Sequence, residues 1–135
     1  MSTSALDSII GNSIQSVSFD EASKHWHIHF NNDDVLIIKC LWRLLEGGFI
    51  SATSEDHNQH FGWKTAFDGV ARLEEVGKHW IDAVNVHAAT GDIGIQFLEQ
   101  YILQIIPISA GHIAWQFKRS DGKTFTATGG EIKTI

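Results

Sequence analysis

Within residues 24–30, KHWHIHF, polar and apolar residues alternate strictly from His25 onward. A β-strand turns successive side chains to opposite faces, so this stretch predicts a strand with one apolar face and one imidazole face. The apolar face holds Trp26, Ile28 and Phe30, and the other face holds His25, His27 and His29. Because antiparallel sheets commonly bury one face and expose the other, we expect the three histidines on the solvent side.

The apolar positions repeat at a shift of 67 residues. Residues 5–19 align without gaps with residues 72–86, and the alignment continues through the strand at 24–30. Matched apolar pairs are Leu6 with Leu73, Ile14 with Ile81, Val17 with Val84, and Trp26 with Ile93. The three histidines fall on Asp92, Gly94 and Gln96, so the fold demands no particular side chain on that face. The pattern predicts an internal duplication in which residues 6–38 and 73–105 superimpose.

Each half opens with signals for a short helix. Ser4 followed by Asp7 resembles a capping box, and Gly11 is placed to end that helix. In the second half, Asp68 is suited to cap a helix that ends at Gly77 in the left-handed conformation. Alternating runs predict strands at 14–19, 35–45, 48–53, 81–86, 113–118 and 124–128.

These elements predict a β-rich α+β fold in a single domain, 1–135, built from two similar halves. The halves span 4–53 and 68–128, and each is expected to hold a short helix and about four antiparallel strands. The polar stretch 54–67 matches no regular element and joins the halves. Since connecting loops lie at the surface and often carry function, it is the first place to look for a binding site.

Composition narrows the possible partners. The chain has 135 residues, 43% of them hydrophobic, and a formal net charge of -6. An acidic chain is poorly suited to nucleic acid or anionic membranes, and it suits a basic protein. The single cysteine, Cys40, excludes an internal disulfide, and we expect no signal peptide, no membrane span, no cofactor and a cytoplasmic location.

The loop at 54–67 carries the candidate binding residues, which are Glu55, Asp56, His57, His60 and Trp63. Acids beside imidazoles can hold a metal or exchange protons, although a polar connecting loop has the same composition. An exposed tryptophan is a common anchor of protein interfaces. We therefore take these residues as a protein-binding site, with no catalytic residues assigned.

The histidines of residues 24–30 and the single cysteine are candidates for metal binding and for catalysis. His25, His27 and His29 form the alternative metal site, but three ligands along one strand lie nearly in a line and seldom converge on one ion, so no metal is predicted. Cys40 sits on an apolar face and is expected to be buried and inert. The chain has no GxGxxG, GxxxxGK[ST], GxSxG or HExxH, which disfavours the common enzyme classes.

Several short patterns resemble small uncharacterised bacterial proteins, some of which are immunity proteins encoded beside polymorphic toxins. They are an I-x-x-V before W-x-I-x-F-x-N, then LWRL, GDIGIQF and the turn SDG. The resemblance spans most of the chain and transfers no functional residues. It implies a non-enzymatic protein-binding protein, in its narrower form an immunity protein that neutralises a basic toxin. The alternatives are a small-ligand or metal-binding domain that uses the histidine face, and an enzyme of unrecognised type.

Overall fold

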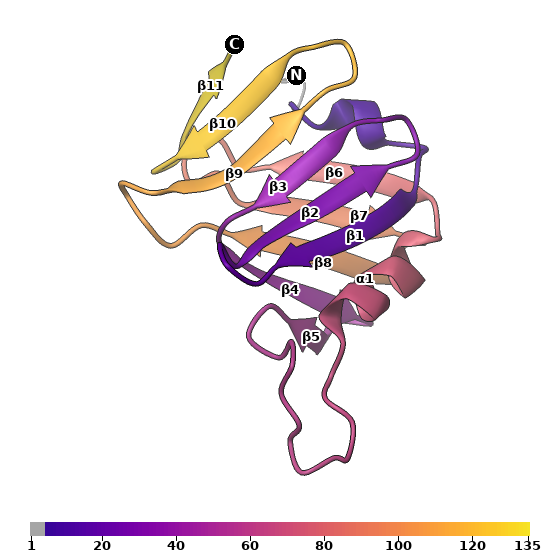
Figure 1. Cartoon of the computed structure of the whole chain (residues 1–135). Coiled ribbons are helices and arrows are strands. Elements are labelled where there is room, and N and C mark those ends of the chain that lie inside the picture. The colour runs from indigo at the N-terminus through magenta and orange to yellow at the C-terminus, as the bar shows by residue number, and fades with distance from the viewer. Residues whose placement is uncertain (1–4) are drawn as a thin grey trace.

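Two antiparallel β-sheets packed face to face make up most of the molecule, seen in the computed structural model of Figure 1. The structure describes residues 5–135. Its elements are η1 (Asp7–Ile9), β1 (Ile14–Asp20), β2 (His25–Phe30), β3 (Val35–Ile38), β4 (Leu41–Glu46), β5 (Phe49–Thr53), α1 (Gly69–Gly77), β6 (Ile81–Val86), β7 (Ile93–Phe97), β8 (Tyr101–Ile106), β9 (Ile113–Lys118), β10 (Thr124–Thr128) and β11 (Glu131–Thr134).

The first sheet, sheet A, has the strand order β1-β2-β3-β9-β10-β11, and the second, sheet B, has the order β5-β4-β8-β7-β6. The chain crosses from sheet A to sheet B between β3 and β4 and returns between β8 and β9. Both inner faces contribute to one hydrophobic core. Its largest fully buried side chains are Trp42, Trp115, Phe30, Phe97 and Phe117. The expectation of a β-rich fold with antiparallel strands is confirmed.

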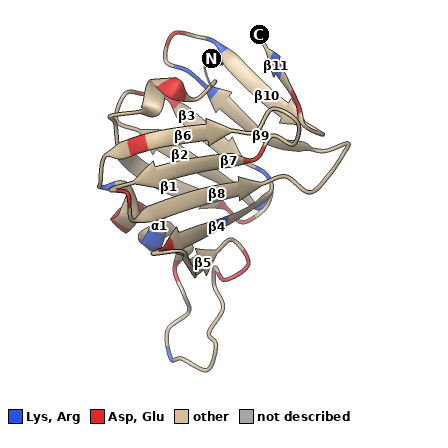
Figure 2. Cartoon of the chain, turned by 180° about the vertical axis from the view of Figure 1, so that it is seen from behind, with Lys and Arg blue, Asp and Glu red and all other residues tan. Residues whose placement is uncertain are grey.

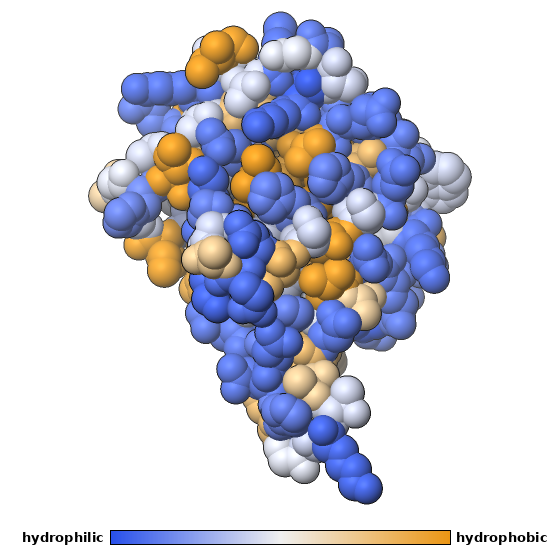
Figure 3. All heavy atoms as spheres, in the orientation of Figure 1, coloured by the Kyte–Doolittle hydropathy of each residue, from blue (hydrophilic) through white to orange (hydrophobic). Residues whose placement is uncertain are grey.

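The predicted sidedness of β2 is also confirmed. Trp26, Ile28 and Phe30 are buried in the core. His25 and His27 are half-buried and His29 is exposed on the outer face of sheet A. Figure 3 views the molecule from the side of sheet A, and hydrophilic residues dominate this surface.

The first half does not contain the predicted α-helix. Among the described residues it has only the 3-10 turn η1, three residues long, and Gly11 follows with a φ of +82°. Ser4, the proposed cap, lies outside the described residues. Because β1 begins at Ile14, only a few residues remain for a helix between the start of η1 and the strand.

The predicted strand at 35–45 is two strands. β3 ends at Ile38 in sheet A and β4 begins at Leu41 in sheet B, so the chain changes sheets at Lys39 and Cys40. The alternation continues across the break because both strands face the same core. The described part of the half 4–53 therefore has five strands, and the half 68–128 also has five, rather than about four each; β11 follows the second half.

The helix α1 lies beside β1, an edge strand of sheet A. Asp68 caps it as predicted, since its carboxylate accepts a hydrogen bond from the N–H of Ala71 (3.1 Å). Gly77 is not a left-handed cap. It is the buried last residue of the helix, and an added Cβ would lie 2.5 Å from Cβ of Ile14. The sequence signal at Gly77 thus reflects close packing between α1 and β1.

The three-stranded units β1-β2-β3 and β6-β7-β8 resemble each other in strand register and in the burial of matched residues. Their first pairs break register at Ile14/Ser16 and at Ile81/Ala83, which are equivalent positions under the 67-residue shift. Trp26 and Ile93, the matched core positions, are both buried. The superposition of residues 6–38 on 73–105 stays a prediction.

Asp34 is a buried carboxylate that joins three segments. Its oxygens accept hydrogen bonds from the hydroxyl of Ser8 (2.6 Å), the side-chain amide of Asn32 (2.8 Å) and the backbone N–H of Ser120 (2.8 Å). These donors belong to the segment before β1, the β2-β3 turn and the β9-β10 turn. Three donors compensate the loss of hydration that burial of a carboxylate requires.

Candidate functional site

The loop between β5 and α1 extends away from the two sheets (Figure 1). Backbone hydrogen bonds close its base: the N–H of Asn58 donates to the carbonyl of Phe67 (2.8 Å), and the N–H of Phe67 donates to the carbonyl of Gln59 (2.8 Å). Asp56 accepts from the N–H of Thr53 (2.9 Å) and so stabilises the first turn. The loop is therefore a narrow, hydrogen-bonded projection.

His57 fixes the base of the loop to the body. Its Nδ1 accepts a hydrogen bond from the N–H of Gly69, the first residue of α1, at 3.0 Å. Its ring makes edge contacts with Phe19 (centroids 4.8 Å apart) and Trp26 (5.0 Å). Asn58 adds a hydrogen bond to the carboxylate of Glu21 in the β1-β2 turn (3.1 Å). His57 is thus a structural residue rather than part of a solvent-facing cluster.

A tight turn forms the far end of the loop. The N–H of Trp63 donates to the carbonyl of His60 (2.7 Å), and Nδ1–H of His60 donates back to the carbonyl of Trp63 (3.1 Å). The two central residues, Phe61 and Gly62, have φ values of +50° and +84°. Glycine adopts this conformation freely, whereas it is unfavourable for a bulky residue such as phenylalanine.

Two aromatic rings stand exposed on this turn. Phe61 is 57% exposed and Trp63 is 60% exposed. Their rings meet edge to face with centroids 5.5 Å apart. We call the turn at residues 60–63 with its two rings the aromatic tip. It presents an apolar surface to solvent, in which the rings contact each other and the backbone is held by two hydrogen bonds.

The five residues predicted as a binding site do not form one cluster. Asp56 and His57 have their polar atoms engaged at the base of the loop. His60 and Trp63 lie together at the aromatic tip. Sequence reasoning did not single out Phe61, although the glycine that follows it offered a signal, because glycine is common in tight turns.

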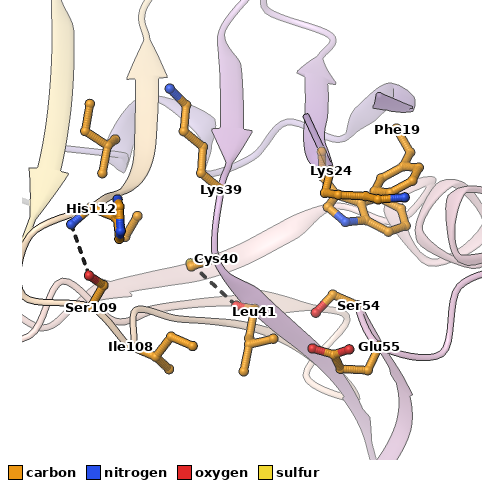
Figure 4. A pocket seen from close by; sticks show the side chains of 13 residues that line it. Phe19, Lys24, Lys39, Cys40, Leu41, Ser54, Glu55, Ile108, Ser109 and His112 are labelled. Carbon is orange, nitrogen blue, oxygen red and sulfur yellow. Dashed lines mark hydrogen bonds between the residues drawn. The ribbon is translucent and has the colours of Figure 1, made fainter. Parts of the chain in front are cut away.

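Glu55 lines a different feature, a cleft of about 580 Å³ at the end of the molecule where the chain crosses between the sheets (Figure 4). Local sequence patterns do not indicate this cleft, because its walls come from segments that are distant in the sequence. They are Phe19, Lys24, Trp26, Lys39, Cys40, Leu41, Ser54, Glu55, Ile108, Ser109, His112, Ile113 and Ala114.

Three polar groups of this cleft, on Cys40, Ser109 and Lys24, are partly buried or already paired. Burial raises the pKa of the Cys40 thiol to about 12, which leaves it protonated and a poor nucleophile. The hydroxyl oxygen of Ser109 accepts from the backbone N–H of His112 (3.0 Å), so it stabilises a turn. The ammonium groups of Lys24 and Lys39 lie apart in Figure 4, and that of Lys24 pairs with Glu21 (3.1 Å).

The histidine face of β2 lies beside polar residues of β1. His25, His27 and His29 pair across the strands with Asp20, Ser18 and Ser16. Burial lowers the pKa of His27, and the neighbouring His29 and His25 lower it further, while Asp20 has the opposite effect. Within residues 5–135, no group of three or more His, Cys, Asp or Glu side chains is placed to hold one metal ion.

Comparison with family models, with curated proteins and with solved structures finds no match for this chain. No helix in the described part of the chain combines the length and apolar character needed to cross a bilayer.

Proposed function

We propose that this chain is a non-enzymatic protein-binding protein and that the aromatic tip inserts into its partner. The observation that carries the proposal is the exposed, edge-to-face pair of Phe61 and Trp63 on a turn closed by two hydrogen bonds. Aromatic anchors that are already ordered lose little conformational entropy on binding, and they dominate the energetics of many protein interfaces.

The backbone of Phe61 supports this proposal. A bulky residue with a φ of +50° is rare, and such strain persists only where the surrounding structure enforces it. The strained conformation at the tip places the ring in solvent, where it makes no contact with the core. Neither ring lines the cleft that holds Glu55. A surface that projects in this way fits a groove on another protein better than it holds a small ligand.

The charge of the chain favours a basic partner. The net charge of -6 attracts a cationic protein from a distance, which raises the rate of association more than the final affinity. Glu55 is exposed at the base of the loop and can contribute. The narrower form of the proposal is a bacterial, cytoplasmic immunity protein that neutralises a basic toxin, as the sequence resemblance implies.

The test is capture of a partner from a lysate of the native host by the immobilised chain, followed by mass spectrometry and measurement of the dissociation constant. The test variant is Trp63→Ser. Its matched control is Trp80→Ser, because Trp80 is 61% exposed and Trp63 is 60% exposed. We expect Trp63→Ser to weaken binding at least about 30-fold, equivalent to about 2 kcal/mol, and Trp80→Ser to leave it unchanged.

A captured partner that binds Trp63→Ser as tightly as the wild type would contradict the proposal. The charge contribution is tested separately with Glu55→Lys, which should slow association at low salt. Asp56 is unsuitable for this purpose, because replacing it also removes the acceptor for the N–H of Thr53.

We further propose that the chain arose by internal duplication, with residues 6–38 equivalent to 73–105. The equivalent register breaks at Ile14/Ser16 and Ile81/Ala83 support this origin. In this view η1 and α1 are diverged forms of one helical segment. An experimental structure in which the two ranges superimpose poorly would exclude it.

A further inference from the structure

The outer face of sheet B departs from the usual pattern of a solvent-exposed sheet. Antiparallel sheets with one wet face carry mainly polar residues on that face, as sheet A does. On β4 and β8, the two neighbouring strands of sheet B, four of the outward side chains are aliphatic. They are Leu41, Leu45, Ile102 and Ile106. Between them lie Arg43 and Gln104, which are hydrogen-bonded to each other.

The neighbouring strands add uncharged positions to this surface, some apolar and some polar. One row across the sheet consists of Ile50, Leu45, Ile102, Gln96 and Ala83. The next row consists of Thr53, Arg43, Gln104, Gly94 and Asn85. Arg43 is the one charged residue among these ten positions. Figure 2 shows the same side of the molecule, and the ribbons of β7 and β8 carry no charged residue. Ile50 is 60% exposed and Ile102 is 37% exposed, so solvent reaches this face.

We propose that this face, the outer surface of sheet B, binds a second copy of this chain to form a symmetric dimer. A basic partner would find almost no carboxylate here, and a nucleic acid would find almost no cation. Another copy of the same face presents the same aliphatic side chains, and its one cation, Arg43, lies beside the carboxylate of Asp92. Contact at this face therefore brings two chains of charge -6 together over a surface that carries few charges.

The charged groups at this face fit this arrangement. Arg43 and Asp92 both line a hollow of about 300 Å³ above Gly94, which has no side chain to fill it. In a two-fold dimer every contact occurs twice, so Arg43 of each copy can meet Asp92 of the other. The hollow can receive an aliphatic side chain from the second copy, which buries apolar surface on both sides.

The size of the face is sufficient for a dimer of modest affinity. Five strands spaced about 4.8 Å apart, with about five residues of about 3.3 Å each, cover roughly 400 Å² in projection. Side chains stand above this plane, so two copies together bury on the order of 1,000 Å², which is near the lower limit of specific interfaces. We therefore expect dimerisation in the micromolar range, independent of the aromatic tip.

Sedimentation equilibrium of the full chain tests the proposal over about 1 to about 200 µM, the range in which a small interface associates. The wild type should approach twice the 15.0 kDa mass of one chain as its concentration rises. Ile102→Lys should weaken the dimer at least about tenfold, because it places a charge within the apolar contact. The matched control is Ile113→Lys, since Ile113 is also 37% exposed and lies in sheet A.

Ile50→Lys provides a second variant on the same face in case Ile102→Lys impairs folding, and the thermal unfolding midpoint reports folding for each. A wild-type chain that stays monomeric throughout the series would overturn the proposal. So would a dimer that both face variants retain, or one that Ile113→Lys disrupts instead.

Discussion

Replacing His57 with alanine should loosen the attachment of the loop and lower the free energy of unfolding by about 2 kcal/mol. The variant loses the acceptor for the N–H of Gly69, and a net hydrogen bond contributes about 1 kcal/mol. It also loses edge contacts with Phe19 and Trp26, each contributing about 0.5 kcal/mol at a half-buried site. His57→Asn keeps an acceptor near the same place and should recover about half of the loss.

Urea unfolding followed by tryptophan fluorescence measures these differences. The control is His29→Ala, which removes an exposed imidazole from the outer face of sheet A and should change the free energy by less than about 0.5 kcal/mol. If His57→Ala and His29→Ala were equally stable, His57 would not fix the loop, and its contacts would not contribute to the free energy of unfolding.

Three further predictions concern buried or partly buried groups. Asp34→Ala should lower the free energy of unfolding by about 3 kcal/mol in the same urea assay, because Ser8 and Ser120 lose a buried acceptor; a change below about 0.5 kcal/mol would contradict this. The pKa of His27 is lowered from 6.5 in the fold, so the unfolded chain binds the proton more readily. Stability should therefore fall as the pH drops from about 6.5 to about 5, and His27→Gln should show a smaller fall. Cys40, whose pKa is raised to about 12, should react with iodoacetamide at about pH 8 at least about 100-fold faster in the urea-unfolded chain than in the folded chain.

The sequence predicted the core better than the connections. The alternation at 24–30 correctly placed Trp26 inside and the histidines outside. In a strand, residues that alternate in polarity lie on opposite faces, so the pattern shows which face is buried. The break between β3 and β4 could not be predicted from the same alternation. Side chains of both sheets point into one core, so the pattern continues through Lys39 and Cys40. The alternation of apolar and polar residues therefore does not reveal where the chain passes from one sheet to the other.

The site depended on contacts between distant residues, which local patterns do not encode. Asp34 lies in the polar stretch 31–34, yet its carboxylate is buried because Ser8 and Ser120 supply donors from elsewhere in the chain. His57 belongs to a polar loop, and its structural role depends on Phe19 and Gly69. The position of the loop and the presence of Trp63 in it were predictable, while the separation of its base from its aromatic tip was not.

Hydrogen–deuterium exchange of the chain with and without its captured partner tests the central proposal most directly. We predict slower exchange on binding in peptides that cover residues 59–66, with the outer face of sheet A unchanged. The wild type and the Trp80→Ser variant should give the same protection. A complex in which residues 59–66 exchange as fast as in the free chain, with protection located elsewhere, would contradict the proposal that the aromatic tip is the binding surface.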